Sequence, residues 1–434
     1  MRRICLTLPT NRPCADTLTA VAQEASWAAG HFGVEVVLLV LDSSSRVSFA
    51  RHAAVLAGSP RSGATVLHLD EDDQRAFLRQ VVDGAGVLKP DLLLDLMLPA
   101  GVSYGACTNR AFLLAAALGC ESVHRRDSDF RYQIHDGTKV FPVLHELTSL
   151  GWRARDVIGS VTETDLDPAH LDRPVVLAGG SFIGELSVDI GEIAALDKEV
   201  YYDVVGLWAP AGWSREEKRK LADDSFAGAG DEPFTGDHSV LSVVDPMHVD
   251  MCNIAFYQVH EQMPLSPATD TIGSDYFLHH LVRSAGLPGV LHNRHIVNYH
   301  TAERKTGAGF DAYHLRLTKF FLSMLYLHFV YDRMAELGDS LLDSRFHVRT
   351  PVVAELIRNS TELAEDENAE RLDVLGRSYR KLGGRYAAFA ATLPERGPLL
   401  LAEAERDAAD FALLAEDWAA LVSRSKATPL RQNR

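Results

Sequence analysis

Residues 101–129 read GVSYGACTNRAFLLAAALGCESVHRRDSD, and the rest of the chain is interpreted outward from this stretch. It begins with a glycine-rich loop, continues as an apolar helix and places Gly119 where that helix would end. A short extended segment then leads to Asp127, Ser128 and Asp129. Two carboxylates one residue apart can point from a turn to one site, and such oxygens suit hard divalent cations. A cation held there would neutralise a diphosphate, although many acidic pairs are only solvated turns.

Composition sets the class of protein. The 434 residues are 47% hydrophobic, which is enough for a large core and, by length, two or three domains. The formal net charge of -16 argues against a nucleic-acid partner but leaves room for one nucleotide site. Five dispersed cysteines without a C-x-x-C pair are typical of reduced thiols, so we expect a cytoplasmic protein. No apolar run reaches 18 residues, and the start, MRRICLTLPTNRP, is interpreted as a strand rather than a signal peptide, so no membrane span is predicted.

Strands and helices alternate before the opening stretch. Apolar runs predict strands at residues 4–8, 34–41 and 65–69, and helical periodicity predicts helices at residues 16–30, 48–57 and 74–84. This order predicts a doubly wound, mostly parallel sheet, in which ligands bind beyond the carboxyl ends of the strands. The residues at those ends are Pro9, Thr10, Asn11, Asp42 and Asp70. The alternative for the two aspartates is a helix cap or a turn.

The pattern changes after Asp129. Asp136 and Gly137 predict a hairpin within residues 132–150, and residues 175–184 are predicted to form a strand that breaks at Gly179 and Gly180. A further strand is predicted over residues 289–299. Helices are then expected at residues 310–336, 352–365, 368–392 and 398–423, with breaks at Pro351, at residues 383–384 and at residues 394–398.

The order of a strand, a glycine loop, Asn-Arg on a helix, a second strand and an acidic pair resembles the nucleotide-sugar half of GT-A fold glycosyltransferases, closest to the family 2 type. The matching positions are Gly105, Asn109 and Arg110 on the helix and Asp127 and Asp129 in the acidic motif. The chain departs from this pattern at residues 122–126, SVHRR, where the family usually has an apolar strand. The resemblance implies an α/β fold of the GT-A kind, which is Rossmann-like with a doubly wound, mostly parallel sheet. An α-helical C-terminal region follows it.

A later part of the chain resembles the acceptor half of the same family. Residues 251–256, MCNIAF, are similar to a G-x-N-x-A-F strand with Cys252 in place of glycine. The family's Glu-Asp pair falls at Ser274 and Asp275, where only the second acid is kept. His300 follows 25 residues after Asp275, where the family often has a histidine that completes the metal site. Its competitors in the sequence are His292 and His295.

The resemblance implies a metal-dependent enzyme that moves a sugar from a nucleotide-diphosphate sugar to a hydroxyl-bearing acceptor, such as a small molecule or natural product. The implied ligands of Mn2+ or Mg2+ are Asp127, Asp129 and His300. Asp275 would be the general base of an inverting reaction, with Asp270 as the second choice. The implied donor contacts are Pro9, Thr10, Asn11, Asp42, Asp70, Asn109, Arg110, Gly179, Gly180 and Arg304.

Residues 1–309 are expected to form the glycosyltransferase domain, with a nucleotide-sugar half at about 1–130 and an acceptor half at about 131–309. Residues 310–424 would form a helical region that either lines the acceptor side of the site or forms the interface of a homodimer. Residues 425–434 would form a flexible tail. Three alternatives remain open: a retaining enzyme of the mannosylglycerate synthase kind, a catalytically inactive nucleotide-sugar-binding protein, and a nucleotidyltransferase. The last is disfavoured because residues 9–16, PTNRPCAD, lack a G-x-G-T-R-like loop.

Overall fold

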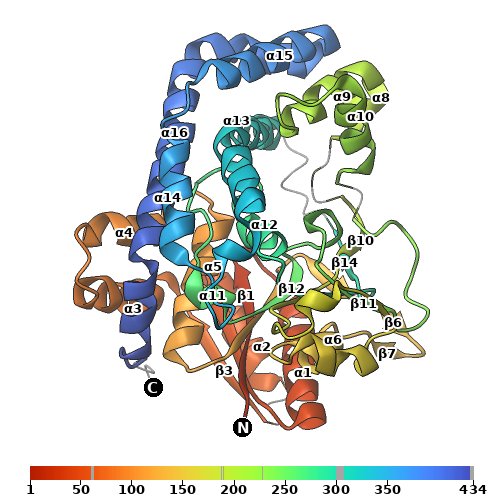
Figure 1. The fold of residues 1–434 in the computed structure, drawn as a ribbon, viewed down its shortest axis with the longest axis vertical. Helices are drawn as coiled ribbons and strands as arrows, with labels where there is room; N and C mark the ends of the chain where they lie inside the picture. Colours follow the sequence, from red (N-terminus) through yellow and green to blue (C-terminus); the bar gives the residue numbers. More distant parts are fainter. Residues whose placement is uncertain (60–62, 187, 189, 227, 300–306, 431–434) are drawn as a thin grey trace.

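The computed structural model describes residues 1–59, 63–186, 188, 190–226, 228–299 and 307–430 (Figure 1). A nine-stranded sheet in the order β3-β2-β1-β4-β12-β9-β13-β11-β8 forms its centre. The first four strands in this order are parallel: β3 (Ala64–Leu69), β2 (Glu35–Asp42), β1 (Arg3–Thr10) and β4 (Ser122–Arg126). The helices that connect them are α1 (Ala15–Phe32), α2 (Arg46–Gly58), α3 (Glu71–Gly84), α4 (Pro90–Met97) and α5 (Tyr104–Ala117). The predicted doubly wound α/β fold is thus confirmed.

Both faces of this parallel half are covered. Alternate residues of a strand point to opposite faces, so Leu6 of β1 packs in one apolar core with Leu18 of α1. Its neighbour Cys5 belongs to a second core, which includes Phe77 of α3 and Phe112 of α5. A strand buried on both faces has an apolar run with no alternation, which explains the sequence VEVVLLVL at residues 34–41.

The other half of the sheet is mixed. β12 (Asn253–Tyr257) is antiparallel to both of its neighbours, β4 and β9 (Leu177–Gly179), and β9 is parallel to β13 (Gly289–His292). The far edge consists of β11 (Ser239–Ser242) and β8 (Glu163–Asp165). A separate small sheet joins β10 (Phe182–Gly184), β14 (Ile296–Asn298) and β5 (Phe130–Tyr132), so the strand predicted over residues 289–299 is divided between two sheets.

The predicted hairpin consists of β6 (Ile134–His135) and β7 (Thr138–Lys139), and both turn residues have positive φ. The remaining helices of residues 131–299 are short. They are α6 (Val143–Ser149), α7 (Ala154–Val157), α8 (Gly191–Leu196), α9 (Lys198–Val205), α10 (Arg215–Asp224), α11 (Val259–Gln262) and α12 (Phe277–Ser284).

β4 is buried at every residue, although its sequence is SVHRR. Arg126 donates to Glu24 of α1 at 2.9 Å and to Glu146 of α6 at 3.0 Å, and all three side chains are fully buried. His124 lies 2.7 Å from the same Glu146. Ion pairing with hydrogen bonds is what permits charged groups in a protein interior. Partners from two helices therefore make this polar strand a core strand.

Four helices complete the chain: α13 (Gly307–Leu337), α14 (Thr350–Ser360), α15 (Asp366–Leu382) and α16 (Gly384–Lys426). A break at Gly383 is confirmed, with φ of 74°. The predicted break at residues 394–398 is wrong, because α16 continues through Pro394 and Pro398. Each proline removes one local hydrogen bond, and its ring crowds the carbonyl group four residues earlier. Packing of the same stretch against α15, where Gly397 faces Leu372, offsets that loss.

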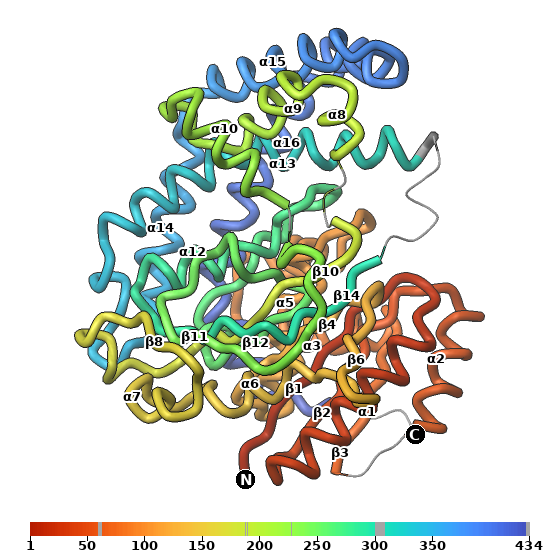
Figure 2. Tube along the Cα trace, turned by 90° about the vertical axis from the view of Figure 1, so that its right-hand side faces the viewer, coloured from red at the N-terminus to blue at the C-terminus, as the bar shows by residue number. Residues whose placement is uncertain are grey.

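α16 runs from α15 at one end of the molecule to α3 at the other, so the helical region lies along the sheet domain (Figures 1 and 2). Trp418 in its last part is fully buried, and its indole N–H donates to the carbonyl oxygen of His260 at 3.1 Å. Within the described part of the chain, no helix has the length and apolar character needed to cross a bilayer.

Candidate active site

The acidic motif lies in the turn between β4 and β5, at the carboxyl end of a central strand. The side chain of Asp127 is 31% exposed, and that of Asp129 is half as exposed. The hydroxyl of Thr17 in the first turn of α1 lies 3.2 Å from the carbonyl oxygen of Ser128 and 3.3 Å from that of Phe130. The position of this turn therefore depends on the start of α1.

Arg125 joins the acidic motif to the predicted general base. Its Nη1 donates to Oδ2 of Asp275 at 2.5 Å, and its Nη2 lies 3.1 Å from Oδ1 of Asp127. Burial would lower the pKa of this guanidinium, but Asp127 and Asp275 raise it well above its ordinary value. Arg125 is therefore a permanent buried cation between two carboxylates that lie about 150 residues apart in sequence.

Asp275 stands two residues before α12. Burial raises its pKa, the ion pair with Arg125 lowers it, and the charge of Asp127 raises it again, so that the net pKa lies above its ordinary value. The preceding Ser274 replaces an acid of the resembled pattern. Its hydroxyl accepts a hydrogen bond from the N–H of Gly105 at 3.3 Å and so holds the glycine loop. A Cβ at Gly105 would overlap the carbonyl oxygen of Ser266, so glycine is required there.

Two further residues of this site belong to no motif of the sequence. Arg12 donates from Nη1 to Oδ2 of Asp129 at 2.9 Å. Asp250 accepts from the hydroxyl of Tyr276 at 2.8 Å, and its pKa is raised by burial and also by the charge of Asp127. Asp250 directly precedes the MCNIAF motif and Arg12 follows the first strand, so only their position beside motif residues could have indicated them.

Asp270 contacts the glycine loop at residues 101–102. Its backbone has φ of 49°, its N–H donates to the carbonyl oxygen of Val102 at 2.7 Å, and its carboxylate accepts from the N–H of Val102 at 3.2 Å. Asp270 therefore clamps the loop that precedes α5, and a role as general base stays a prediction.

Asn109 and Arg110 of α5 both form hydrogen bonds with other segments of the protein. The side-chain amide of Asn109 donates to the carbonyl oxygen of Leu265 and accepts from its N–H, both at 2.8 Å. Arg110 donates to Gln74 at 2.8 Å and to the carbonyl oxygen of Met97 at 2.5 Å. Both side chains are buried, so they join α5 to neighbouring segments, and their contact with a nucleotide stays a prediction.

The other predicted donor contacts have different places in the structure. Asp70 caps α3 by accepting from the N–H of Asp73 at 2.8 Å. A Cβ at Gly179 or Gly180 would meet the protein's own atoms, such as Val249 and the backbone of His292, so these glycines serve close strand packing. Thr10 is buried and Asn11 exposed at the end of β1, beside the partly buried Pro9. His300 and Arg304 lie outside the described residues.

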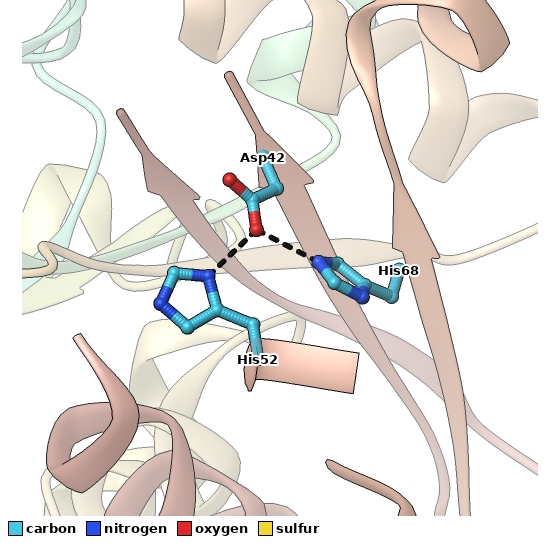
Figure 3. Close-up of side chains that lie close together, drawn as sticks. All are labelled: Asp42, His52 and His68. Atoms are coloured by element: carbon cyan, nitrogen blue, oxygen red, sulfur yellow. Dashed lines mark hydrogen bonds and ion pairs between the residues drawn. The ribbon is translucent and has the colours of Figure 1, made fainter. Parts of the chain in front are cut away.

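Asp42 belongs to a buried cluster with two histidines (Figure 3). Nδ1 of His52 lies 2.7 Å, and Nε2 of His68 2.9 Å, from the same carboxylate oxygen, Oδ2. The N–H of Ser44 donates to the other oxygen at 2.9 Å. Burial would raise the pKa of Asp42, but the donors from His68, Ser44 and His52 lower it well below its ordinary value. The carboxylate is thus surrounded by its own donors, and a ribose contact stays a prediction.

The carboxylates of the acidic turn fit a hard cation such as Mn2+ or Mg2+ by their chemistry and by the exposure of Asp127. Among the described residues, the one group of three ligand atoms within 4.8 Å of one another is instead Asp42, His52 and His68. The competing histidines do not complete the turn: His292 is buried and stacked on His145, and Nδ1 of His295 accepts from the N–H of Ser181 at 3.0 Å. No third ligand atom in the described part of the chain forms such a group with Asp127 and Asp129, so a metal site at the turn stays a prediction.

Comparison with known proteins gives one family match and only distant similarity to solved structures. A model described as "Family of unknown function (DUF6271)" matches residues 2–434. No curated protein matches. A mannosyltransferase from Pyrobaculum calidifontis, solved with GDP-mannose and Mn2+, is 14% identical with a TM-score of 0.35, covering 94% of this chain and 86% of its own.

Two further solved structures have lower similarity. Mouse xyloside xylosyltransferase 1 is 11% identical with a TM-score of 0.24, covering 64% of this chain and 72% of its own. Core-mannan synthase A from Aspergillus fumigatus, solved with Mn and GDP, is 8% identical with a TM-score of 0.24, covering 66% and 65%. Scores this low carry no argument about activity.

Proposed function

The chain belongs to the DUF6271 family, and from the geometry of its site we propose that it is a metal-dependent glycosyltransferase. It would move a sugar from a nucleotide-diphosphate sugar to a hydroxyl group of an acceptor. The observation that carries the proposal is Arg125, which brings the acidic turn and Asp275 together at the carboxyl end of β4. That edge is where doubly wound sheets bind their ligands.

Asp127 and Asp129 would hold Mn2+ or Mg2+. The bound cation would neutralise the diphosphate as it leaves, which is the electrostatic contribution of such ions to group transfer. Arg12 holds Asp129 and Arg125 holds Asp127, so both carboxylates are oriented before a cation arrives. Such preorganisation lowers the cost of binding.

Asp275 is the proposed general base for the acceptor hydroxyl. A base works best when its pKa lies near the working pH, and the raised pKa of Asp275 moves it in that direction. Arg125 keeps the carboxylate ionised and fixes its orientation. In the retaining alternative, the same carboxylate would contact a sugar hydroxyl and take no proton.

A second function is favoured by one observation. Each acid of the motif is paired with an arginine, so part of its charge is already balanced within the protein. A protein of this kind could bind a nucleotide sugar without turnover. The two functions differ in whether donor is consumed.

The full chain should be incubated with GDP-, UDP- and dTDP-sugars in the presence of Mn2+. We expect one donor to raise the melting temperature, because a ligand at 100 times its Kd stabilises the native state by about 2.7 kcal/mol. The same donor should be hydrolysed slowly, and both effects should disappear in Asp129→Ala. Binding without hydrolysis would select the non-catalytic function, and no shift with any donor would reject both.

A further inference from the structure

The cluster of Asp42, His52 and His68 has a hydrogen-bond pattern that fixes the tautomer of one ring. The backbone N–H of Cys14 donates to Nε2 of His52 at 3.0 Å, so this nitrogen carries a lone pair. A neutral imidazole then has its proton on Nδ1, where it donates to Asp42 at 2.7 Å. Both nitrogens of His52 are therefore used: Nδ1 donates to Asp42, and Nε2 accepts from the Cys14 amide, with the Cys14 Sγ at a longer 3.9 Å from it.

The same pattern argues against a metal ion at the cluster. A metal bound to Nδ1 would require the proton to move to Nε2, where it would face the N–H of Cys14. The separations of 2.7 and 2.9 Å between the ring nitrogens and Asp42 are hydrogen-bond lengths. They are shorter than the roughly 3.3 Å expected between ligands that each lie about 2.0 Å from one tetrahedral zinc.

Cys14 connects this cluster to the acidic turn. It precedes α1 and follows the loop that carries Arg12, whose guanidinium holds Asp129. Thr17, three residues after Cys14, donates to the backbone of the same turn. The Cys14 amide is thus the point at which the buried cluster anchors both contacts to the acidic turn.

We propose that His52 is a positioning residue, which accepts the Cys14 amide and thereby fixes the loop through which Arg12 orients Asp129. Asp42 supports this role, because its carboxylate accepts a hydrogen bond from Nδ1–H and so keeps Nε2 available as the acceptor. His68 stabilises Asp42 from the other side and is stacked on Phe49, and among the described residues its hydrogen bond goes to Asp42 and not to the Cys14 amide. The effect of His52 on a bound cation rests on the proposed function, whereas its effect on the loop does not.

Two conservative variants distinguish the roles of the two ring nitrogens. An asparagine amide reaches about as far as Nδ1, so His52→Asn keeps a donor for Asp42 and loses the acceptor for Cys14. A glutamine amide reaches about as far as Nε2, so His52→Gln keeps that acceptor and loses the Asp42 donor. His68→Phe is the matched control, since it removes a donor to Asp42 without touching the loop.

The first measurement is amide hydrogen exchange of the peptide that covers residues 11–18. We expect exchange about tenfold faster in His52→Asn, because a local opening replaces the lost anchor. His52→Gln and His68→Phe should exchange like the native protein. Equal acceleration in His52→Asn and His52→Gln, or none in His52→Asn, would overturn the proposal.

The second measurement is the affinity for Mn2+ alone, followed by electron paramagnetic resonance of the free ion. Loss of a residue that orients a ligand typically weakens binding by about tenfold or more, and this is expected for His52→Asn only. If the native chain binds no Mn2+, the metal-dependent function fails while the exchange result still decides the role of His52. Stoichiometric zinc in the purified native chain that is lost in His52→Asn and in His68→Phe would overturn the proposal in favour of a metal site.

Discussion

Nη1 of Arg125 lies 2.5 Å from Oδ2 of Asp275, and both side chains are almost completely buried. The same guanidinium reaches Asp127, which is the exposed end of the three-residue bridge. A buried ion pair contributes little net stability, but removal of one partner leaves an uncompensated charge in the interior. Replacement of either Arg125 or Asp275 alone should therefore lower the stability of the protein, whereas replacement of both by uncharged residues should lower it less.

Arg125→Met should destabilise the protein by about 3–5 kcal/mol, because Asp275 would remain buried without its cation. The double variant Arg125→Met with Asp275→Asn should recover a large part of that loss, since the one carboxylate left without its cation is then that of Asp127, which is 31% exposed. Urea unfolding of the native protein and the variants measures both effects. Losses that simply add in the double variant would show that the pair is not coupled.

Asp275→Asn should lower sugar transfer by about 10²–10⁴-fold, the usual contribution of a positioned base. Donor binding should change little, because the base contacts the acceptor and not the diphosphate, and because Arg125 keeps its ion pair with Asp127. Steady-state kinetics and a thermal-shift titration of the donor measure the two quantities separately. Loss of donor affinity would make Asp275 a sugar or metal contact and favour the retaining reaction, and unchanged activity would leave Asp270 as the next residue to test.

Trp418→Ala should destabilise the protein by about 3–5 kcal/mol, the usual cost of removing a fully buried large aromatic side chain. The loss should appear as a shift of a single unfolding transition, because this tryptophan joins α16 to the carbonyl oxygen of His260 in the sheet domain. Leu399→Ala is the control on the same helix, since Leu399 is 58% exposed and should change stability by less than about 0.5 kcal/mol. An early separate transition in Trp418→Ala would mean that the helical region unfolds independently.

β1 and β2 could be predicted because each has the continuous apolar run of a strand that is buried on both faces. β4 has no such pattern. Arg126 is buried because Glu24 and Glu146, which are 102 and 20 residues away in sequence, lie beside it in the fold. No local feature of residues 122–126 indicates those partners.

The continuity of α16 through Pro394 depends in the same way on its packing against α15. A proline in a sequence predicts a helix end from local chemistry alone. The stabilising contact, Gly397 against Leu372, becomes visible only in the tertiary structure.

The site shows a similar division. Asp127, Asp129 and Asp275 could be proposed from the sequence because they belong to an ordered set of motifs. Arg12 and Asp250 stand alone in the sequence, and their place beside the acidic turn follows from the strand order. Asn109 and Arg110 match the resembled helix by position, yet their side chains bind the protein's own backbone and Gln74.

Stability should decrease as the pH falls below about 6.5, because several histidines are buried in the neutral form. Burial lowers the pKa of His260 and of His279 to about 3, with smaller effects from Lys426 on the first and from His280 and Arg125 on the second. Neither ring has a hydrogen-bond partner among the described residues. In the unfolded chain both would take up a proton near pH 6.5, whereas the folded chain resists protonation down to about pH 3.

The sign follows from the protons bound in each state. Below pH 6.5 the unfolded chain binds more protons than the folded one, so acid favours unfolding, and the stability present above pH 6.5 is lost progressively. Each such histidine should contribute about 1.4 kcal/mol per pH unit in this window. Urea unfolding at pH 7.5, 6.5 and 5.5 measures the slope. His279→Phe, which replaces one ring by an apolar ring beside Phe256, should flatten that slope by about one histidine's share, and an unchanged slope would show that His279 is protonated in the folded protein.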